Sequence, residues 1–285
     1  MAKWVLISLE IMSWFIFNDY FCHLNRRKMI HLVYFSATYT TRKVCRGIAR
    51  HLDGAVTEHD ITNVCPKEKV MLSSDDLLIL GMPVYCGRIP EMAVERIQQF
   101  QGNQTKAIAV AVYGNREFDD ALLEMKDLLT ADHFQPVAAA AFIGRHCIFP
   151  TVATARPDDA DEKKMAEFAA DCQPLLQQNI ADLGELQVPG NAEYCPHKRS
   201  VFCPSPNDNC CNCGTCAQLC PVGAISLTDA KEVNADLCIA CGRCIVVCPV
   251  NGREFSGELY AGASVKFTQA NSTRKEPEFF FASSK

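Results

Sequence analysis

The stretch Ile30-His-Leu-Val-Tyr-Phe-Ser-Ala-Thr-Tyr-Thr-Thr41 predicts how the first large part of this chain folds. It begins with a short apolar run and continues into a turn rich in hydroxyl groups. It then leads into Arg42–Leu52, where apolar residues recur at helical spacing. A strand, a turn and a helix in this order form the βα unit of an open parallel sheet.

The same alternation continues to residue 190. Four further apolar runs are typical of buried strands, and three helical patterns lie between or after them. The pattern predicts a doubly wound α/β fold, with a five-stranded parallel sheet of order 2-1-3-4-5 and ligand binding beyond the carboxyl ends of the strands. The later strands are expected at Ala55–His59, Leu77–Gly81, Ala107–Tyr113 and Val137–Ile143, and the later helices at Glu91–Phe100, Asp119–Ala131 and Asp158–Leu183.

The turn Ser36–Thr41 is a candidate phosphate site. Its hydroxyl groups can donate hydrogen bonds, and the N-terminus of the following helix favours negative charge. The turn has no Lys, as a Walker loop would, and it lacks the glycines of a dinucleotide fingerprint. A phosphate monoester such as that of FMN would fit, although similar residues before a helix often serve only as N-caps.

Two later turns, Gly81–Pro90 and Tyr113–Asp120, favour a flavin. Both follow central strands and combine aromatic residues with glycines, so they can cover a flavin ring and offer backbone groups to its polar edge. The alternative is that Tyr85 and Tyr113 only stabilise their turns. His146 follows the expected edge strand and should therefore lie away from this crevice.

A duplicated cysteine motif marks the second part of the chain. Cys210-x2-Cys213-x2-Cys216-x3-Cys220-Pro221 is repeated 28 residues later as Cys238-x2-Cys241-x2-Cys244-x3-Cys248-Pro249. This is the spacing of bacterial ferredoxins, in which the fourth cysteine of each run binds the other cluster. Zinc sites use paired cysteines, and they do not explain three cysteines at this spacing before Cys-Pro. The prediction is two [4Fe–4S] clusters, one held by Cys210, Cys213, Cys216 and Cys248, the other by Cys220, Cys238, Cys241 and Cys244.

Composition limits the class of protein. The chain has 17 cysteines among 285 residues, and eight of them stand in metal-ligand spacing, which indicates a reducing compartment and hence the cytoplasm. A net charge of −5 argues against a nucleic-acid binder. The region 191–254 has few large apolar side chains, so the clusters must supply much of its core.

The two ends of the chain are less regular. Residues 1–28 form an apolar run that acids interrupt and basic residues follow, which is unlike a signal peptide. We expect a dispensable leader or a mis-assigned start before Met29, with a membrane anchor as the alternative. Near the other end, the aromatics of Glu276–Phe281 should pack against one of the domains. The expected organisation is a leader (1–28), an α/β domain (29–190), a small α+β two-cluster domain (191–254) and a tail (255–285).

The α/β part resembles the flavodoxin-like family, whose phosphate loop has the form T/S-x-T-x-x-T. Ala37 and Tyr39 stand where that family often has glycine, so the loop is altered or holds FMN weakly. The resemblance implies phosphate contacts from Ser36, Thr38, Tyr39, Thr40 and Thr41, and ring contacts from Pro83, Val84, Tyr85, Cys86, Gly87, Arg88, Tyr113, Gly114, Asn115, Arg116, Phe118 and Asp119.

A flavodoxin-like domain joined to a two-cluster ferredoxin domain resembles the EFR1-type flavoferredoxins over residues 29–281. The segments Pro-Val-Tyr-x-Gly-Arg-x-Pro (83–90), Tyr-Gly-Asn-Arg-Glu (113–117) and Glu-Pro-Glu-Phe-Phe (276–280) carry the resemblance. It implies an electron carrier between FMN and the clusters that links one- and two-electron redox partners.

No catalytic residue is predicted for such a carrier. The alternatives are a flavin-dependent reductase of a small organic substrate, and a ferredoxin that has lost FMN. The expected partners are redox proteins, with no nucleic acid and no membrane unless residues 1–28 are an anchor. A homodimer is compatible with this role.

Overall fold

The computed structural model describes residues 28–285, so the predicted leader lies outside the described residues except for Lys28. The central sheet contains five parallel strands in the order β2-β1-β4-β6-β7, which confirms the predicted doubly wound topology. These strands are β1 (Met29–Tyr34), β2 (Ala55–Asp60), β4 (Leu77–Pro83), β6 (Thr105–Tyr113) and β7 (Phe134–Ile143).

A sixth strand, β10 (Glu278–Phe281), pairs antiparallel with β7, so the expected five-stranded sheet was one strand short. The tail aromatics do more than pack against a domain. Phe279 and Phe281 contact the buried cluster on one face of the sheet, while Phe280 contacts the cluster on the other face. This alternation is the two-residue period of a strand, and the pairing covers the edge of β7.

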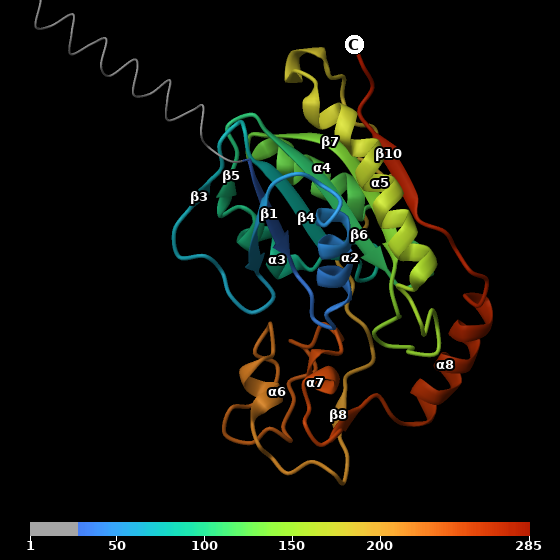
Figure 1. Cartoon of the computed structure of the whole chain (residues 1–285). Coiled ribbons are helices and arrows are strands. Elements are labelled where there is room, and N and C mark those ends of the chain that lie inside the picture. The colour runs from blue at the N-terminus through green and yellow to red at the C-terminus, as the bar shows by residue number, and fades with distance from the viewer. Residues whose placement is uncertain (1–27) are drawn as a thin grey trace, which may run out of the picture.

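Helices cover both faces of the sheet (Figure 1). One face carries α2 (Thr40–Ala49) and α5 (Asp159–Gln177), whose apolar side chains share a buried cluster with the strands. The other face carries α3 (Glu91–Ile97) and α4 (Ala121–Ala131). The sheet therefore lies between two helical layers, and its central strands are apolar on both sides, as a parallel sheet requires.

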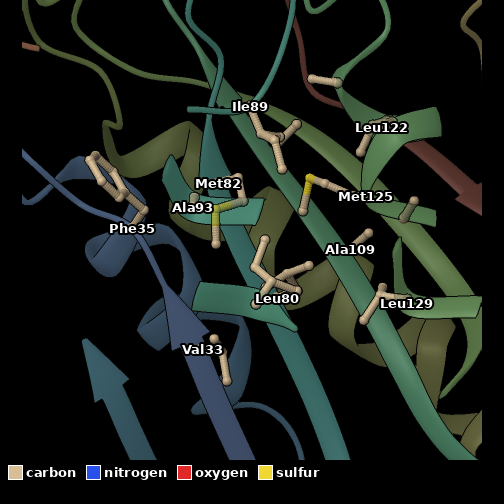
Figure 2. Close-up of a cluster of buried hydrophobic side chains, with 14 of the residues drawn as sticks. Val33, Phe35, Leu80, Met82, Ile89, Ala93, Ala109, Leu122, Met125 and Leu129 are labelled. Atoms are coloured by element: carbon tan, nitrogen blue, oxygen red, sulfur yellow. The ribbon is translucent and has the colours of Figure 1, made fainter. Parts of the chain in front are cut away.

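The core on the α3 and α4 side consists of close-packed aliphatic side chains. Figure 2 shows Val33, Leu80 and Ala109 of the sheet together with Ala93 of α3 and Met125 of α4. All five side chains are almost fully buried. Burial of each large aliphatic side chain contributes roughly 1.5–3 kcal/mol to the stability of this half.

The cysteine-rich half, defined as residues 191–254, lies against the carboxyl ends of the parallel strands (Figure 1). It contains two single-turn helices, α6 (Thr215–Gln218) and α7 (Arg243–Val246). A short antiparallel pair, β8 (Ser205–Pro206) with β9 (Arg253–Glu254), joins its beginning to its end. Its apolar cluster contains only four buried residues, which agrees with the expectation that bound metal supplies much of its core.

The remaining elements connect these parts. The short strands β3 (Val70–Met71) and β5 (Phe100–Gln101) pair beside the main sheet, and the turn η1 (Ile180–Asp182) follows α5. Helix α8 (Glu258–Ala270) leads from the cysteine-rich half back toward β10 (Figure 1). Among residues 28–285, no helix is both long enough and apolar enough to cross a membrane.

Candidate flavin cavity and cysteine clusters

A cavity of about 490 Å³ lies between the α/β half and the cysteine-rich half, at the carboxyl ends of the central strands. The loops that follow β1, β4, β6 and β7 form one side. Residues of the cysteine-rich half form the other side, and Phe267 of α8 completes it. They are His197–Phe202, Val222, Leu237, Ile239 and Ala240. Cofactor sites usually measure about 300–1,000 Å³ and occupy this end of a doubly wound sheet.

All three loops predicted to contact FMN meet at this cavity. Ten of the seventeen predicted residues line it, from the loops after β1, β4 and β6. Their contact with FMN stays a prediction, but the donors and apolar walls that FMN needs are present. The ten residues are Thr38, Thr40, Thr41, Pro83, Val84, Tyr85, Cys86, Tyr113, Gly114 and Arg116.

The loop after β1 supplies hydroxyl groups and a helix N-terminus. The hydroxyls of Thr38 and Thr40 lie 3.4 Å apart, and α2 begins at Thr40. Ser36 faces elsewhere, because its Oγ accepts a hydrogen bond of 3.0 Å from the backbone N–H of Arg42 and so caps the helix. Tyr39 adopts a left-handed conformation with φ 65°, at a position where glycine would be unstrained.

Several basic side chains line the cavity, and only one of them was predicted from the sequence. Arg116 was predicted, but Arg145, Lys198 and Arg199 also line the walls, with Glu91 as the one carboxylate among the lining residues. Arg145 lines the same walls as the hydroxyl groups of the loop after β1. This set of charges suits an anionic group such as a phosphate.

His146 lines the cavity, so the expectation that it would lie away from the crevice was wrong. The loop after β7 folds back over the sheet, since the backbone N–H of His146 donates to Val152 O at 3.2 Å. The ring Nδ1 accepts hydrogen bonds from the backbone N–H groups of Ile148 and Phe149, both at 3.1 Å. Burial, helped by nearby Arg116, lowers the pKa of His146 to about 4, so the ring is neutral and its Nε2 carries the proton.

Gly114 explains how closely the loops after β6 and β7 approach. A Cβ atom at this position would lie 2.4 Å from Cδ2 of His146, so a larger residue would displace the imidazole. The glycine therefore allows two of the four loops to form one wall.

The other predicted ring contacts serve the fold. Arg88 binds both carboxylate oxygens of Glu124 at 2.8 Å and donates to Cys195 O at 2.7 Å. The amide of Asn115 donates to Asn271 O and Thr273 O, both at 2.8 Å, and so anchors the tail.

Three more predicted residues also lie outside the cavity wall. Phe118 is buried against Tyr113, and Asp119 pairs with Arg116. A side chain at Gly87 would collide with Asp119. With Ser36, Tyr39, Arg88 and Asn115, these make up the seven predicted residues that do not line the cavity.

The eight motif cysteines form two sets, each around its own small cavity. Cys220 lines one cavity with Cys238, Cys241 and Cys244. Cys248 lines the other with Cys210, Cys213 and Cys216. The two cavities thus bring together the cysteines of each crossed set that the spacing predicts, and Cys211 also lines the second cavity. Four thiols at one site fit the donor chemistry of a [4Fe–4S] cluster, and ligation by these residues stays a prediction. Among residues 28–285, no group of three or more His, Cys, Asp or Glu is placed to hold a single metal ion.

The duplicated sequence also produces duplicated geometry. Cys220 Sγ accepts a hydrogen bond from Ala224 N at 3.2 Å, and Cys248 Sγ accepts one from Gly252 N at 3.0 Å. Gly214 and Gly242 precede the two short helices with φ of 77° and 73°. Backbone hydrogen bonds to sulfur tune the reduction potential of an iron–sulfur cluster. Each set therefore has at least one such hydrogen bond, at the same position of the repeat.

Comparisons with known proteins agree with this geometry. A flavodoxin domain model matches residues 31–179, which is just over half of the chain, and a 4Fe-4S binding domain model matches residues 231–254. The chain belongs to the flavodoxin domain family. The flavodoxin domain implies FMN and the second match implies [4Fe–4S] binding, so this is a flavodoxin–ferredoxin fusion and an FMN and iron–sulfur electron-transfer protein.

Several solved structures resemble the flavodoxin domain of this chain. They include a flavodoxin from the domain Archaea, with 12% identity over 53% of this chain and 99% of that chain and a TM-score of 0.37. The flavodoxin of Streptococcus pneumonia TIGR4 has 13% identity over 52% of this chain and 99% of its own, with a TM-score of 0.38. An azoreductase from Bacillus anthracis has 12% identity, 50% and 99% coverage and a TM-score of 0.36. No curated protein matches the chain.

One cysteine set lies against the flavodoxin domain. We call Cys220, Cys238, Cys241 and Cys244 the inner set, and Cys210, Cys213, Cys216 and Cys248 the outer set. Val222 and Ile239 line both the 490 Å³ cavity and the cavity of the inner set. The cavity of the outer set shares no lining residue with the 490 Å³ cavity, so the inner set is the one that adjoins the candidate flavin cavity.

Proposed function

We propose that this protein is a two-cluster electron carrier of the EFR1 type, which passes electrons between FMN and two [4Fe–4S] clusters. One observation carries the proposal. The cavity lined by the predicted FMN loops is also lined by Ile239 and Ala240, which lie between two cysteines of the inner set. A flavin in this cavity would therefore be adjacent to the inner cluster.

When bound, FMN exchanges one or two electrons and each cluster exchanges one, which supplies the link between one- and two-electron partners. The chain positions these groups and excludes water between them. Val222 and Ile239 form an apolar wall that the two cavities share. Arg145 and the hydroxyls of Thr38 and Thr40 would hold the phosphate.

The outer set suits exchange with a partner protein. Each set has one buried cysteine, Cys216 in the outer set and Cys241 in the inner set, but only the outer set has an exposed one, Cys213. Electrons would then pass between FMN and the inner cluster, and between the inner and outer clusters, before they reach a redox partner. The thiol-rich composition suits a reducing cytoplasm, where such partners are found.

The test is anaerobic purification after cluster reconstitution, with the released flavin identified by chromatography and iron assayed in the same sample. The proposal predicts about one FMN and about eight iron atoms per chain, as two four-iron clusters require. Eight iron atoms with no FMN, even after incubation with FMN, would reject the flavoprotein and leave a ferredoxin on an α/β domain. About four iron atoms would reject the second cluster.

A further inference from the structure

The run Cys238–Cys244 supplies three of the four cysteines of the inner set, and we call it the inner motif. It contains a buried arginine that reaches the flavodoxin domain. Arg243 lies between Cys241 and Cys244 and is the first residue of α7. Its side chain is only 7% exposed. No ion pair to a carboxylate is found for it in the described part of the chain, so its contacts with the flavodoxin domain account for its placement.

Arg243 contacts the predicted phosphate loop at two points. One of its terminal nitrogens donates to Ala37 O at 3.2 Å. Its guanidinium carbon lies 4.9 Å from the centroid of the Tyr39 ring, and Arg42 lies 4.7 Å from the same centroid. The ring is therefore held by two cations, one from each half of the molecule.

Tyr39 is the residue of this loop that needs such support. Its φ of 65° and ψ of −2° place a bulky residue in the left-handed region immediately before α2. Thr38 and Thr40 flank it and supply the hydroxyls that line the cavity. If the backbone at Tyr39 relaxed, those hydroxyls and the first N–H groups of α2 would move away from the phosphate position.

The contact surface continues next to Arg243. A Cβ atom on Gly242 would lie 3.4 Å from Cys147 O and 3.6 Å from Cγ2 of Thr38, so the inner motif lies directly on the phosphate loop. The thiol of Cys147 also approaches Ala240 O at 3.7 Å. Because the apolar cluster of the cysteine-rich half contains only four buried residues, the position of α7 would depend on the cluster that its cysteines would bind.

We propose that Arg243 is a positioning residue for FMN. From within the inner motif, it holds Tyr39 in the conformation that the phosphate loop requires, so that FMN affinity depends on assembly of the inner cluster. By linkage, bound FMN stabilises the inner cluster to the same extent. The inference rests on the proposed binding of FMN and of the inner cluster.

The experiment measures flavin binding to the full chain with its clusters reconstituted and its flavin removed. Quenching of flavin fluorescence gives the dissociation constants of FMN and, as a matched ligand without phosphate, riboflavin. Arg243→Ala should raise the dissociation constant of FMN about tenfold and leave that of riboflavin within about twofold. Arg243→Lys keeps a cation near the ring and should recover part of the loss.

Substitutions at Tyr39 test the same contact from the other half. Tyr39→Leu removes the ring and should weaken FMN binding as much as Arg243→Ala does, and the double variant should be no worse than either single variant. Tyr39→Phe keeps the ring and should bind FMN as the wild type does. If Arg243→Ala does not take up about eight iron atoms, its FMN affinity cannot be interpreted, and the affinity of Tyr39→Leu is then used as the test.

The inference is overturned if Arg243→Ala and Tyr39→Leu both bind FMN within about twofold of the wild type, or if their effects simply add. Equal weakening of FMN and riboflavin would also overturn it, because the effect would then be a general loss of structure. Wild-type protein that takes up iron but no FMN refutes the proposed function itself.

Discussion

The inner and outer cysteine sets have nearly the same sequence pattern but different surroundings. Three backbone carbonyls around the inner set (Leu219, Pro221 and Ala240) and the side chain of Arg243 form hydrogen bonds with the flavodoxin domain. The described hydrogen bonds around the outer set, such as those of Asn207 to Asn251 and of Ala230 to Asn212, stay within the cysteine-rich half. Each set has one buried arginine: Arg243 of the inner motif reaches Ala37, while Arg253 near the outer set donates to Pro204 and Ala230. Duplication therefore repeats the ligand geometry, and contacts outside the repeat distinguish the two sites.

Removal of one cysteine from each set should separate them most strongly. Cys241→Ala should remove about half of the iron and raise the dissociation constant of FMN about 50-fold, because the inner motif would no longer hold the phosphate loop. Cys213→Ala, the equivalent change in the outer set, should remove the same amount of iron and leave FMN affinity within about threefold. Iron assay and flavin fluorescence measure both effects. Equal loss of FMN affinity in the two variants would remove the distinction between the sets.

Arg96 tests the contact beside Cys220. It donates to Ile61 O and Thr62 O at 2.9 and 2.5 Å and to Pro221 O at 2.9 Å. It therefore joins the chain beside Cys220 of the inner set to the flavodoxin domain. Arg96→Ala should lower stability by about 2 kcal/mol, since it leaves three carbonyls without a charged donor. Loss of iron–sulfur absorbance on heating measures this.

The matched change beside the outer set is Asn207→Ala. Asn207 is half-buried, and its side chain donates to Asn251 O at 3.1 Å in an exposed hydrogen bond. Asn207→Ala should lower the free energy of unfolding by less than about 0.5 kcal/mol. A similar melting temperature for both variants would mean that the inner motif gains nothing from its contacts.

Arg145 tests whether the cavity beside the inner set binds a phosphate. It lines the same walls as Thr38 and Thr40 and belongs to the flavodoxin domain. Arg145→Gln should weaken FMN binding about tenfold at low salt and reduce its dependence on salt, while riboflavin binding stays unchanged. Isothermal titration at two salt concentrations checks this. An unchanged salt dependence would place the phosphate elsewhere.

Protonation of His146 should have the smallest effect of these tests, a loss of folding stability at acidic pH. Its pKa is lowered from 6.5 to about 4, mainly by burial, so the neutral ring stabilises the fold fully above pH 6.5. That stabilisation is lost as the pH falls toward 4. Between pH 7 and pH 5.5 the wild type should lose about 1 kcal/mol relative to His146→Asn, whose amide oxygen can accept the same backbone hydrogen bonds. Thermal unfolding of both proteins across this range measures the difference, and parallel curves would contradict the assignment.

Sequence patterns predicted the elements whose signal is local. Apolar runs predicted the central strands, because strands buried on both faces are rich in apolar residues. β2 also lies where it was predicted, although it is an exposed edge strand that contains Glu58 and Asp60. Cysteine spacing predicted the crossed sets, because ligand positions are fixed by the cluster. The role of Arg88 and Asn115 could not be predicted in this way. Both residues lie in loops that reach the cavity, but their place in the sequence does not determine which group a long polar side chain binds. Arg88 binds Glu124, and Asn115 binds the carbonyl of Asn271.

The loop after β7 and strand β10 were missed for a tertiary reason. Arg145 and His146 reach the cavity only because a long loop folds back, which no local pattern reports. The Glu278–Phe281 run shows no apolar–polar alternation in sequence, because its three phenylalanines are consecutive. The two-residue period of a strand is visible only in the structure, where the middle phenylalanine faces one layer and its neighbours face the other.

The position of β10 also affects how the protein can be made. The sixth strand of the flavodoxin sheet is encoded after the cysteine-rich half, so a ribosome releases it only when both cysteine motifs have been synthesised. Until then, the edge of β7 at Ala138–Ala141 has no partner strand and is open to pairing with other chains. A gene fragment that ends near residue 190 should consequently yield an aggregation-prone flavodoxin domain. A synthetic peptide that contains β10, added in trans, should restore it.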